Sequence, residues 1–437
     1  MERQTQLDII KMVHREVIPA TGCTEPVAVA LAVAHASHVM KGKLTSIQLK
    51  LSANILKNAM GVGIPGTGMI GLPIAIALGA VIAEPERQLK VLDGFTEEQF
   101  AAARQIMDDK LIDIGLKEGD VDKLYIEAIL RDEDGHTAVA IIERMHTQLK
   151  SLTLDGKPLQ TASNQNLVET AGCTTANSDE DVEVQLTFDM VYDFATQMPI
   201  SEISFILEAA RLNSNAAEYS LKGEYGHGVG RMIRSAFGKK YMGDTAYTRL
   251  LSYTSAACDA RMDGAPVMVM SNSGSGNQGI TATLPVLSFA EDEKVDEEKK
   301  IRALMLSNLM VIYIKQKLGR LSALCGCVVA STGSATGITY LLGGTREQIG
   351  YAIKNMIGNL TGMICDGAKP SCSLKVASGV SSAMLSSLLA MEEKVVTSNE
   401  GVVDDDIDRS IDNLTSIGRD AMLETDKHVL HIMTHKK

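Results

Sequence analysis

Tryptophan is absent from this 437-residue chain, and phenylalanine occurs only seven times. The core must therefore be built from Ala, Val, Leu and Ile, together with an unusually large number of methionines, 22 in all. Side chains of this size suit closely packed helices joined by glycine-rich loops, and the length allows two or three domains. We therefore expect a protein with a large core and a high helix content.

The chain also lacks clusters of Lys and Arg, and its formal net charge is −12. Phosphate contacts need such clusters, so we expect neither general nucleic-acid binding nor binding to anionic membranes. The polar N-terminal residues do not resemble a secretory signal. The longest apolar stretch, residues 61–83, is interrupted by two prolines and six glycines and is too broken for a membrane span. Seven cysteines in such a chain indicate a reducing cytoplasm.

Segments with helical periodicity and segments with strand-like alternation of apolar residues follow one another along the sequence. Apolar periodicity and capping residues predict helices over residues 5–17, 24–40, 70–83, 96–106, 201–222, 229–237, 246–260, 295–318, 328–342, 345–361 and 373–393. Alternating patterns predict strands over residues 45–51, 123–130, 136–142 and 182–188. We therefore predict an α+β fold. A large, mostly helical domain is formed by residues 1–42 and 196–437, and a smaller α+β domain, residues 43–195, is inserted into it.

Three cysteines in the C-terminal third are the strongest chemical signal. Cys365 and Cys372 enclose a turn-rich segment, and Cys325 lies in a glycine-flanked turn before a run of small residues. Thiolates grouped in this way suggest a soft metal or an iron–sulfur cluster. Free cysteines are also common as small buried packing residues, and the spacing of Cys365 and Cys372 is not that of a zinc finger. Cys327 could replace Cys325 as a ligand.

Cys23 directly precedes the predicted helix that begins at Thr24 and is flanked by Gly22. The positive end of a helix dipole favours a thiolate, so we expect this position to lower the thiol pKa. Cys23 is therefore a candidate base, nucleophile or fourth metal ligand, and packing at a helix cap is the structural alternative.

Two glycine-rich segments, residues 61–68 and 271–279, could present backbone amides and hydroxyls to a small anion such as a carboxylate. Neither has the pattern of a P-loop, and either could be a tight structural turn. The candidate substrate-binding residues on and beside these segments are Ser271, Asn272, Ser273, Gly274, Asn277, Asn54 and Thr67. No Ser/His/Asp motif is visible, and no lysine has a context that indicates pyridoxal phosphate.

Three motifs together resemble the L-cysteine desulfidase family, which is related to the α-subunit of iron–sulfur L-serine dehydratases. They begin at Gly22 (GCTEPVAVAL), Asn272 (NSGSGNQG) and Gly362 (GMICDGAKPSCSLK), and the similarity extends over nearly the whole chain. The resemblance implies an enzyme with a 4Fe-4S cluster that eliminates sulfide from L-cysteine to give pyruvate and ammonia. It places the cluster ligands at Cys325, Cys365 and Cys372, and the proton-accepting cysteine at Cys23.

The chemistry that the resemblance implies agrees with the residue types. Three protein thiolates would leave one iron free to bind an amino-acid substrate, and Cys23 would remove its α-proton. L-Serine dehydration is an alternative, and so is a non-catalytic iron–sulfur or metal-binding protein, including one with a structural zinc ion. Because the helices are rich in Met and Ala, we also expect a homodimer.

Overall fold

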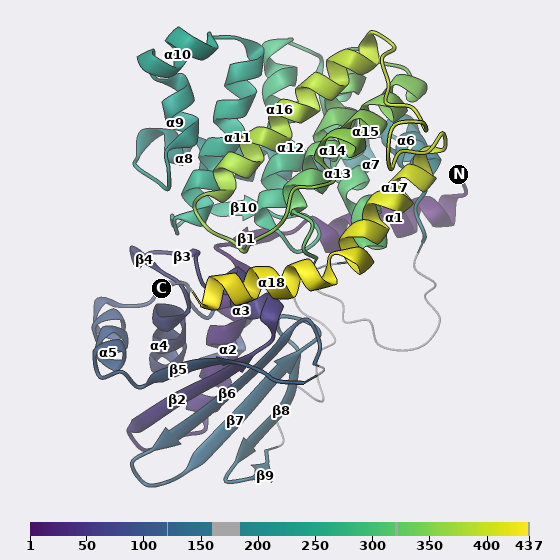
Figure 1. Ribbon diagram of the computed structural model, residues 1–437. Coiled ribbons are helices and arrows are strands. Elements are labelled where there is room, and N and C mark those ends of the chain that lie inside the picture. Colours follow the sequence, from purple (N-terminus) through teal and green to yellow (C-terminus); the bar gives the residue numbers. More distant parts are fainter. Residues whose placement is uncertain (120, 160–183, 320–321, 436–437) are drawn as a thin grey trace.

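A computed structural model describes residues 1–119, 121–159, 184–319 and 322–435. Figure 1 shows two units: a helical bundle above, and below it a twisted sheet covered on one face by helices. The two units have separate buried cores. This architecture confirms the predicted α+β fold with a large helical part.

The helical unit begins with α1 and resumes after the sheet. Its helices are α1 (Arg3–Glu16), α6 (Phe188–Gln197), α7 (Ile200–Ile203), α8 (Leu207–Lys222), α9 (Val229–Arg234), α10 (Ala236–Met242), α11 (Ala246–Met262), α12 (Gly276–Asp292), α13 (Glu297–Leu318), α14 (Gly326–Leu341), α15 (Arg346–Leu360), α16 (Cys372–Met391) and α17 (Ile407–Ser416). A short 3-10 segment lies at Ser204–Ile206, another lies at Pro85–Lys90 in the smaller unit, and Ile417–Ala421 is a π-helical turn. A two-stranded ribbon, β1 (Pro19–Thr21) with β10 (Met268–Met270), joins the first and the central parts of this unit.

The smaller unit contains a six-stranded sheet in the order β5-β2-β6-β7-β8-β9. Its strands are β2 (Leu44–Leu51), β5 (Ile112–Leu116), β6 (Tyr125–Asp132), β7 (Thr137–Glu143), β8 (Leu149–Leu154) and β9 (Lys157–Pro158), and only β2 and β5 pair in parallel. Its helices are α2 (Thr24–His38), α3 (Ala53–Ala59), α4 (Leu72–Ile82) and α5 (Glu97–Asp108), and a short ribbon joins β3 (Gly63–Ile64) to β4 (Met69–Ile70). The C-terminal helix α18 (Leu423–Thr434) crosses the junction and packs on α3 (Figure 1).

Local signals set several of the helix starts. Thr96, Thr245 and Thr345 each form a capping box with the side chain three residues later. In each box the two side chains satisfy backbone groups that a helix start leaves unpaired. These starts agree with the helices predicted from the sequence, within one or two residues.

Several elements differ from the expected layout, among them the following three. The described part of the expected strand 182–188 contains no strand: Thr187 caps α6, which begins at Phe188, while residues 182 and 183 lie outside the described residues. Helix α12 was not predicted, because two glycines and Pro285 interrupt its sequence, yet almost its whole length is buried. Helix α2, assigned to the helical domain by composition, packs in the core of the smaller unit against the sheet.

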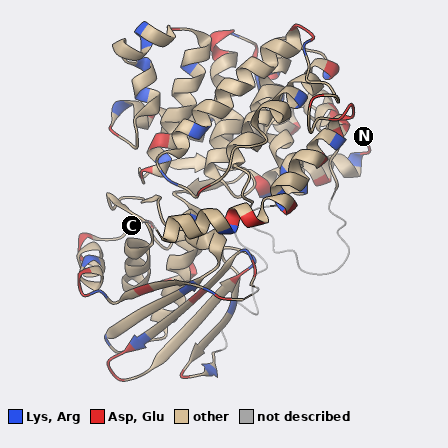
Figure 2. Ribbon diagram, in the orientation of Figure 1, with Lys and Arg blue, Asp and Glu red and all other residues tan. Residues whose placement is uncertain are grey.

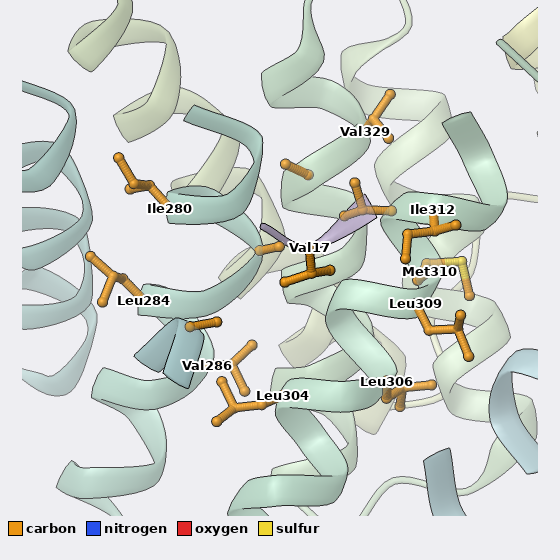
Figure 3. Close-up of a cluster of buried hydrophobic side chains, with 14 of the residues drawn as sticks. Val17, Ile280, Leu284, Val286, Leu304, Leu306, Leu309, Met310, Ile312 and Val329 are labelled. Carbon is orange, nitrogen blue, oxygen red and sulfur yellow. The ribbon is translucent and has the colours of Figure 1, made fainter. Parts of the chain in front are cut away.

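The core of the helical unit is formed by aliphatic side chains, as the composition required. Figure 3 shows how α12, α13 and α14 contribute Ile280, Leu284, Leu304, Leu309 and Val329 to one cluster, with Val17 entering from the N-terminal segment. Small residues let these helices approach closely: a Cβ on Gly333 of α14 would lie 2.5 Å from the Ser307 carbonyl of α13.

Basic and acidic residues are interspersed along the helices and loops of both units (Figure 2). Helix α16 is the only described helix that is long and apolar enough to span a membrane, by length and composition alone. It packs against α11, α14 and α15 in the bundle.

The close packing at the start of α12 yields a stability prediction. A Cβ on Gly279 would lie 2.0 Å from the Met270 carbonyl, so Gly279→Ala must displace backbone. We expect a loss of about 1–3 kcal/mol in the free energy of unfolding, measured by urea denaturation followed by circular dichroism. Gly362→Ala is the control, because a Cβ there meets nothing within 4 Å and should change stability by less than about 0.5 kcal/mol. Equal stability of the two variants would contradict this packing.

Candidate functional site

The backbone brings two of the three candidate ligands together. Leu324 and Ile364 form an isolated antiparallel bridge. The Cys325 amide donates to the Met363 carbonyl (2.9 Å), and the Cys365 amide donates to the Ala323 carbonyl (2.6 Å). The backbone segments that carry Cys325 and Cys365 are therefore paired side by side, although these residues are 40 positions apart in the sequence.

The third cysteine joins them from the start of α16. Cys372 is the first residue of that helix, and its sulfur lies 3.6 Å from the Gly367 carbonyl. Burial raises the pKa of Cys372 to about 11, and the neighbouring thiols of Cys365 and Cys325 add to this increase. Burial, followed by the charge of Cys325, likewise raises the pKa of Cys365. The three thiols are therefore within electrostatic range of one another.

Cys327 is a hydrogen-bond donor to Cys325. This bond lowers the pKa of the Cys325 thiol to about 7 despite its burial, with help from the Cys327 amide and the charge of Lys375. The same contact, with burial, raises the pKa of Cys327 far above its usual value. Cys258 of α11 is a further buried thiol in range of Cys372 and Cys325. Cys325 is thus the member of the pair whose thiolate form is favoured.

Three lysines surround the Cys365–Cys372 segment. Lys375 donates to the Ile364 carbonyl (2.8 Å) and pairs with Asp366, and Lys369 also pairs with Asp366 (2.6 Å). Lys57 of α3 is 1% exposed, lies 3.4 Å from the Cys365 carbonyl and forms an ion pair with Asp426 of α18. Positive charge of this kind favours thiolates and other anions in the segment.

Cys23 caps α2, as expected, but its thiol is not held as a thiolate. Its sulfur donates to the Glu25 carboxylate at 2.8 Å. Burial, and then the charge of Glu25, raise the pKa of Cys23 far above its usual value, while Arg261 and the Glu25 amide act in the opposite direction. The expected lowering by the helix dipole is therefore wrong, because desolvation and a neighbouring carboxylate outweigh it.

Helix α3 connects Cys23 with the three thiols. Asn58 donates to the second oxygen of Glu25 (3.3 Å), while the adjacent Lys57 reaches the Cys365 carbonyl. A Cβ on Gly367 would lie 2.1 Å from the Lys57 carbonyl, so the Cys365–Cys372 segment packs directly on this helix. The Cys23–Glu25 pair and the thiol group thus flank one short helix.

The candidate substrate-binding residues have structural partners. Ser271 and Ser273 are tied to the segment before β1: the Ser271 hydroxyl donates to the Ile18 carbonyl and the Ser273 amide to the Glu16 carbonyl. Asn272 is fully buried and donates to Asn308. Gly274 has a positive φ of 81° in this turn, a conformation that glycine adopts without strain.

The remaining candidates lie at other points around the site. The Thr67 hydroxyl bonds backbone within its own turn. Asn277 accepts a hydrogen bond from Arg261 (3.1 Å). Asn54 donates to Asp426 (2.8 Å) and lines a cleft of about 460 Å³ between the two units, whose wall includes Ala323.

The three cysteines are the candidate ligands of a metal group. Among the described residues, no three His, Cys, Asp or Glu side chains are arranged to hold one metal ion. In a zinc site all the thiolates lie about 2.3 Å from the same metal, whereas each thiolate of a cluster binds its own iron. The three thiols act on one another's pKa, and ion-paired lysines lie beside them.

Comparison with known proteins identifies the family. The family model described as the serine dehydratase alpha chain matches residues 86–431. This chain belongs to the serine dehydratase alpha-chain family. It is 64% identical to a "UPF0597 protein" of Porphyromonas gingivalis over the full length of both chains. Proteins with the same printed name are 58% identical in Parabacteroides distasonis (all of both chains) and 45% identical in Oleidesulfovibrio alaskensis (98% of both chains).

Membership of the serine dehydratase alpha-chain family makes this chain a lyase of the serine dehydratase type. The sequence pattern did not reveal Glu25 or Arg261 as residues of the site. Glu25 lies in the first turn of a helix, where acidic side chains are common. Arg261 lies in the last turn of a helix, where basic side chains are common. Only the fold shows that both are buried beside Cys23.

The Cys23–Glu25 contact yields a prediction about thiol reactivity. Glu25→Gln removes the negative charge that raises the pKa of Cys23, so that pKa should fall. We expect the alkylation rate of Cys23, followed by mass spectrometry against pH, to rise at lower pH than in the wild-type protein. Cys258 in the same sample is the control and should keep its profile. An unchanged Cys23 profile would show that Glu25 does not act on this thiol.

Proposed function

We propose that this chain eliminates sulfide from L-cysteine, giving pyruvate, ammonia and hydrogen sulfide without pyridoxal phosphate. One observation carries the proposal: α3 links the Cys23–Glu25 pair to the three-thiol group through two adjacent residues, Asn58 and Lys57. A proton acceptor and a set of metal-binding thiols therefore share one buried region. Family membership supports a lyase of this general type.

Cys325, Cys365 and Cys372 would hold a 4Fe-4S cluster. When bound, the cluster would supply one iron without a protein thiolate, which can act as a Lewis acid on the substrate. Cys327 would support the ligand set by its hydrogen bond to Cys325. Lys57, Lys369 and Lys375 would offset the negative charge of the thiolates.

The proton chemistry is assigned to Cys23 and Glu25. The Cys23 proton lies on sulfur and points to Glu25, whose carboxylate can accept it over 2.8 Å. The resulting thiolate would take the α-proton of the substrate. The electron pair of the C–H bond then forms the C=C bond, and the C–S bond breaks with its electrons on the departing hydrosulfide. The aminoacrylate product tautomerises and is hydrolysed by water.

L-Serine dehydration is the second candidate, and the description of the matching family favours it. It would use the same proton acceptor and differ only in the leaving group. The non-catalytic metal-binding alternative gives no role to the buried Cys23–Glu25 contact. The expected homodimer and cytoplasmic location stay predictions of the sequence.

The two substrates can be compared on anaerobically reconstituted protein. We expect sulfide release from L-cysteine to be faster than pyruvate formation from L-serine at equal concentration. Cys23→Ala should lower turnover of either substrate by about 10²- to 10⁴-fold, the usual contribution of a general base, while iron content stays at the wild-type level. Faster turnover of L-serine would establish the dehydratase instead. Full activity of Cys23→Ala would refute the base assignment.

The ligand assignment predicts different behaviour for the two neighbouring cysteines. Cys325→Ser, Cys365→Ser and Cys372→Ser should each lose most of the iron and the brown visible absorption after anaerobic reconstitution, because three thiolates are needed. Cys327→Ser is the matched control and should retain the cluster, since a serine hydroxyl can still donate to Cys325. Loss of iron in Cys327→Ser with retention in Cys325→Ser would reverse the assignment.

A further inference from the structure

Buried polar atoms without partners gather on two adjacent helices. Among the described residues, five of these atoms lie on α11 and α12: Ser255 Oγ, Asp259 Oδ1, Arg261 Nε, Gln278 Oε1 and Thr281 Oγ1. A buried polar group without a hydrogen bond costs about 1–3 kcal/mol, so such a concentration needs an explanation. Of these residues, Arg261 is near enough to Cys23 to act on its thiol, and Gln278 packs beside Gly326, the residue after Cys325.

Arg261 is a buried cation with spare hydrogen-bonding capacity. Its side chain is 4% exposed, its Nη1 donates to Asn277 (3.1 Å), and its Nε has no partner. Its charge acts on the thiols of both Cys23 and Cys258. The guanidinium rests on the first residue of α12, since a Cβ on Gly276 would lie 2.2 Å from Nε. Buried arginines are normally paired, and a planar guanidinium matches a carboxylate.

Gln278 lies one residue beyond Asn277 and packs beside Gly326, which follows the candidate ligand Cys325. It is 5% exposed, and its Oε1 has no donor. A Cβ on Gly326, the residue after Cys325, would lie 3.1 Å from the Gln278 side chain. An amide oxygen in this position can only accept, so its complement is an N–H or O–H donor.

We propose that Arg261 binds the α-carboxylate of an amino-acid substrate and that Gln278 Oε1 accepts a hydrogen bond from its α-ammonium group. The two residues supply a donor for the carboxylate and an acceptor for the ammonium group of a zwitterionic amino acid. The start of α12 adds the positive end of a helix dipole on the carboxylate side. Asn277 positions the guanidinium. This inference rests on the proposed function, because it assumes an amino-acid substrate.

Binding of truncated ligands tests the pair without turnover. 3-Mercaptopropionate has the carboxylate but lacks the ammonium group, and cysteamine has the amine but lacks the carboxylate. On reconstituted protein, measured by isothermal titration calorimetry, Arg261→Gln should weaken binding of 3-mercaptopropionate about 10- to 100-fold and leave cysteamine unchanged, because it removes a charge-assisted hydrogen bond. Gln278→Leu should weaken binding of cysteamine and leave binding of 3-mercaptopropionate unchanged.

Kinetics give the second readout. For L-cysteine, Arg261→Gln should raise KM by the same 10- to 100-fold, and Arg261→Lys should recover part of this loss because it keeps the charge without the planar fork. Arg249→Gln on the same helix is the matched control, since Arg249 pairs with Asp292 on the outer side and should leave KM unchanged. Iron content and the circular dichroism spectrum verify that each variant is folded and loaded.

The outcomes separate this inference from the function on which it rests. If the wild-type protein turns over L-cysteine or L-serine, but Arg261→Gln binds both truncated ligands as the wild type does, the carboxylate assignment is wrong and the lyase stands. Equal weakening of both ligands would also overturn it, because that result indicates a structural role. If the wild-type protein neither binds nor converts either amino acid, the proposed function itself fails.

Discussion

The site depends on one short piece of backbone pairing. Two hydrogen bonds, from the Cys325 amide to Met363 and from the Cys365 amide to Ala323, join the start of α14 to the segment that leads into α16. Without this pairing, Cys325 would lie on a different loop from Cys365 and Cys372, and a shared metal group would have no preformed site. The helices behind it are fixed by aliphatic packing, so the pairing is anchored in the largest core of the molecule. Rigid elements hold ligands more accurately than free loops.

Charge balance explains why both units contribute to this region. Thiolates in a buried place require nearby positive charge, and Lys57 provides it from the smaller unit. A fully buried lysine in turn needs an anion, which Asp426 supplies from the C-terminal helix. Helix α18 therefore stabilises the charge of Lys57, which lies beside the Cys365–Cys372 segment. The Lys57–Asp426 ion pair thus explains why α18 extends from one unit to the other.

The sequence predicted most helices and the central strands, because capping residues and apolar periodicity are local signals. It failed for α12, where Gly276, Gly279 and Pro285 weaken the local helix signal and burial between α11, α13 and α14 overrides it. The cysteines were found because a thiol is a rare and chemically specific residue. Whether they bind a cluster stays a prediction, since spacing alone does not measure how sulfur atoms are arranged in space.

Arg261 and Glu25 were missed for a different reason. Each belongs to a residue type that is common at helix ends, and neither forms a motif with its sequence neighbours. Their significance lies in burial: Glu25 accepts the proton of Cys23, while Arg261 keeps an unpartnered donor in a region from which water is largely excluded. A charge held in this way raises the free energy of the empty protein and strengthens the attraction for an incoming anion, because the surrounding dielectric is low. The same two opposite charges beside Cys23 set the direction in which its proton can move, toward Glu25 and away from the guanidinium.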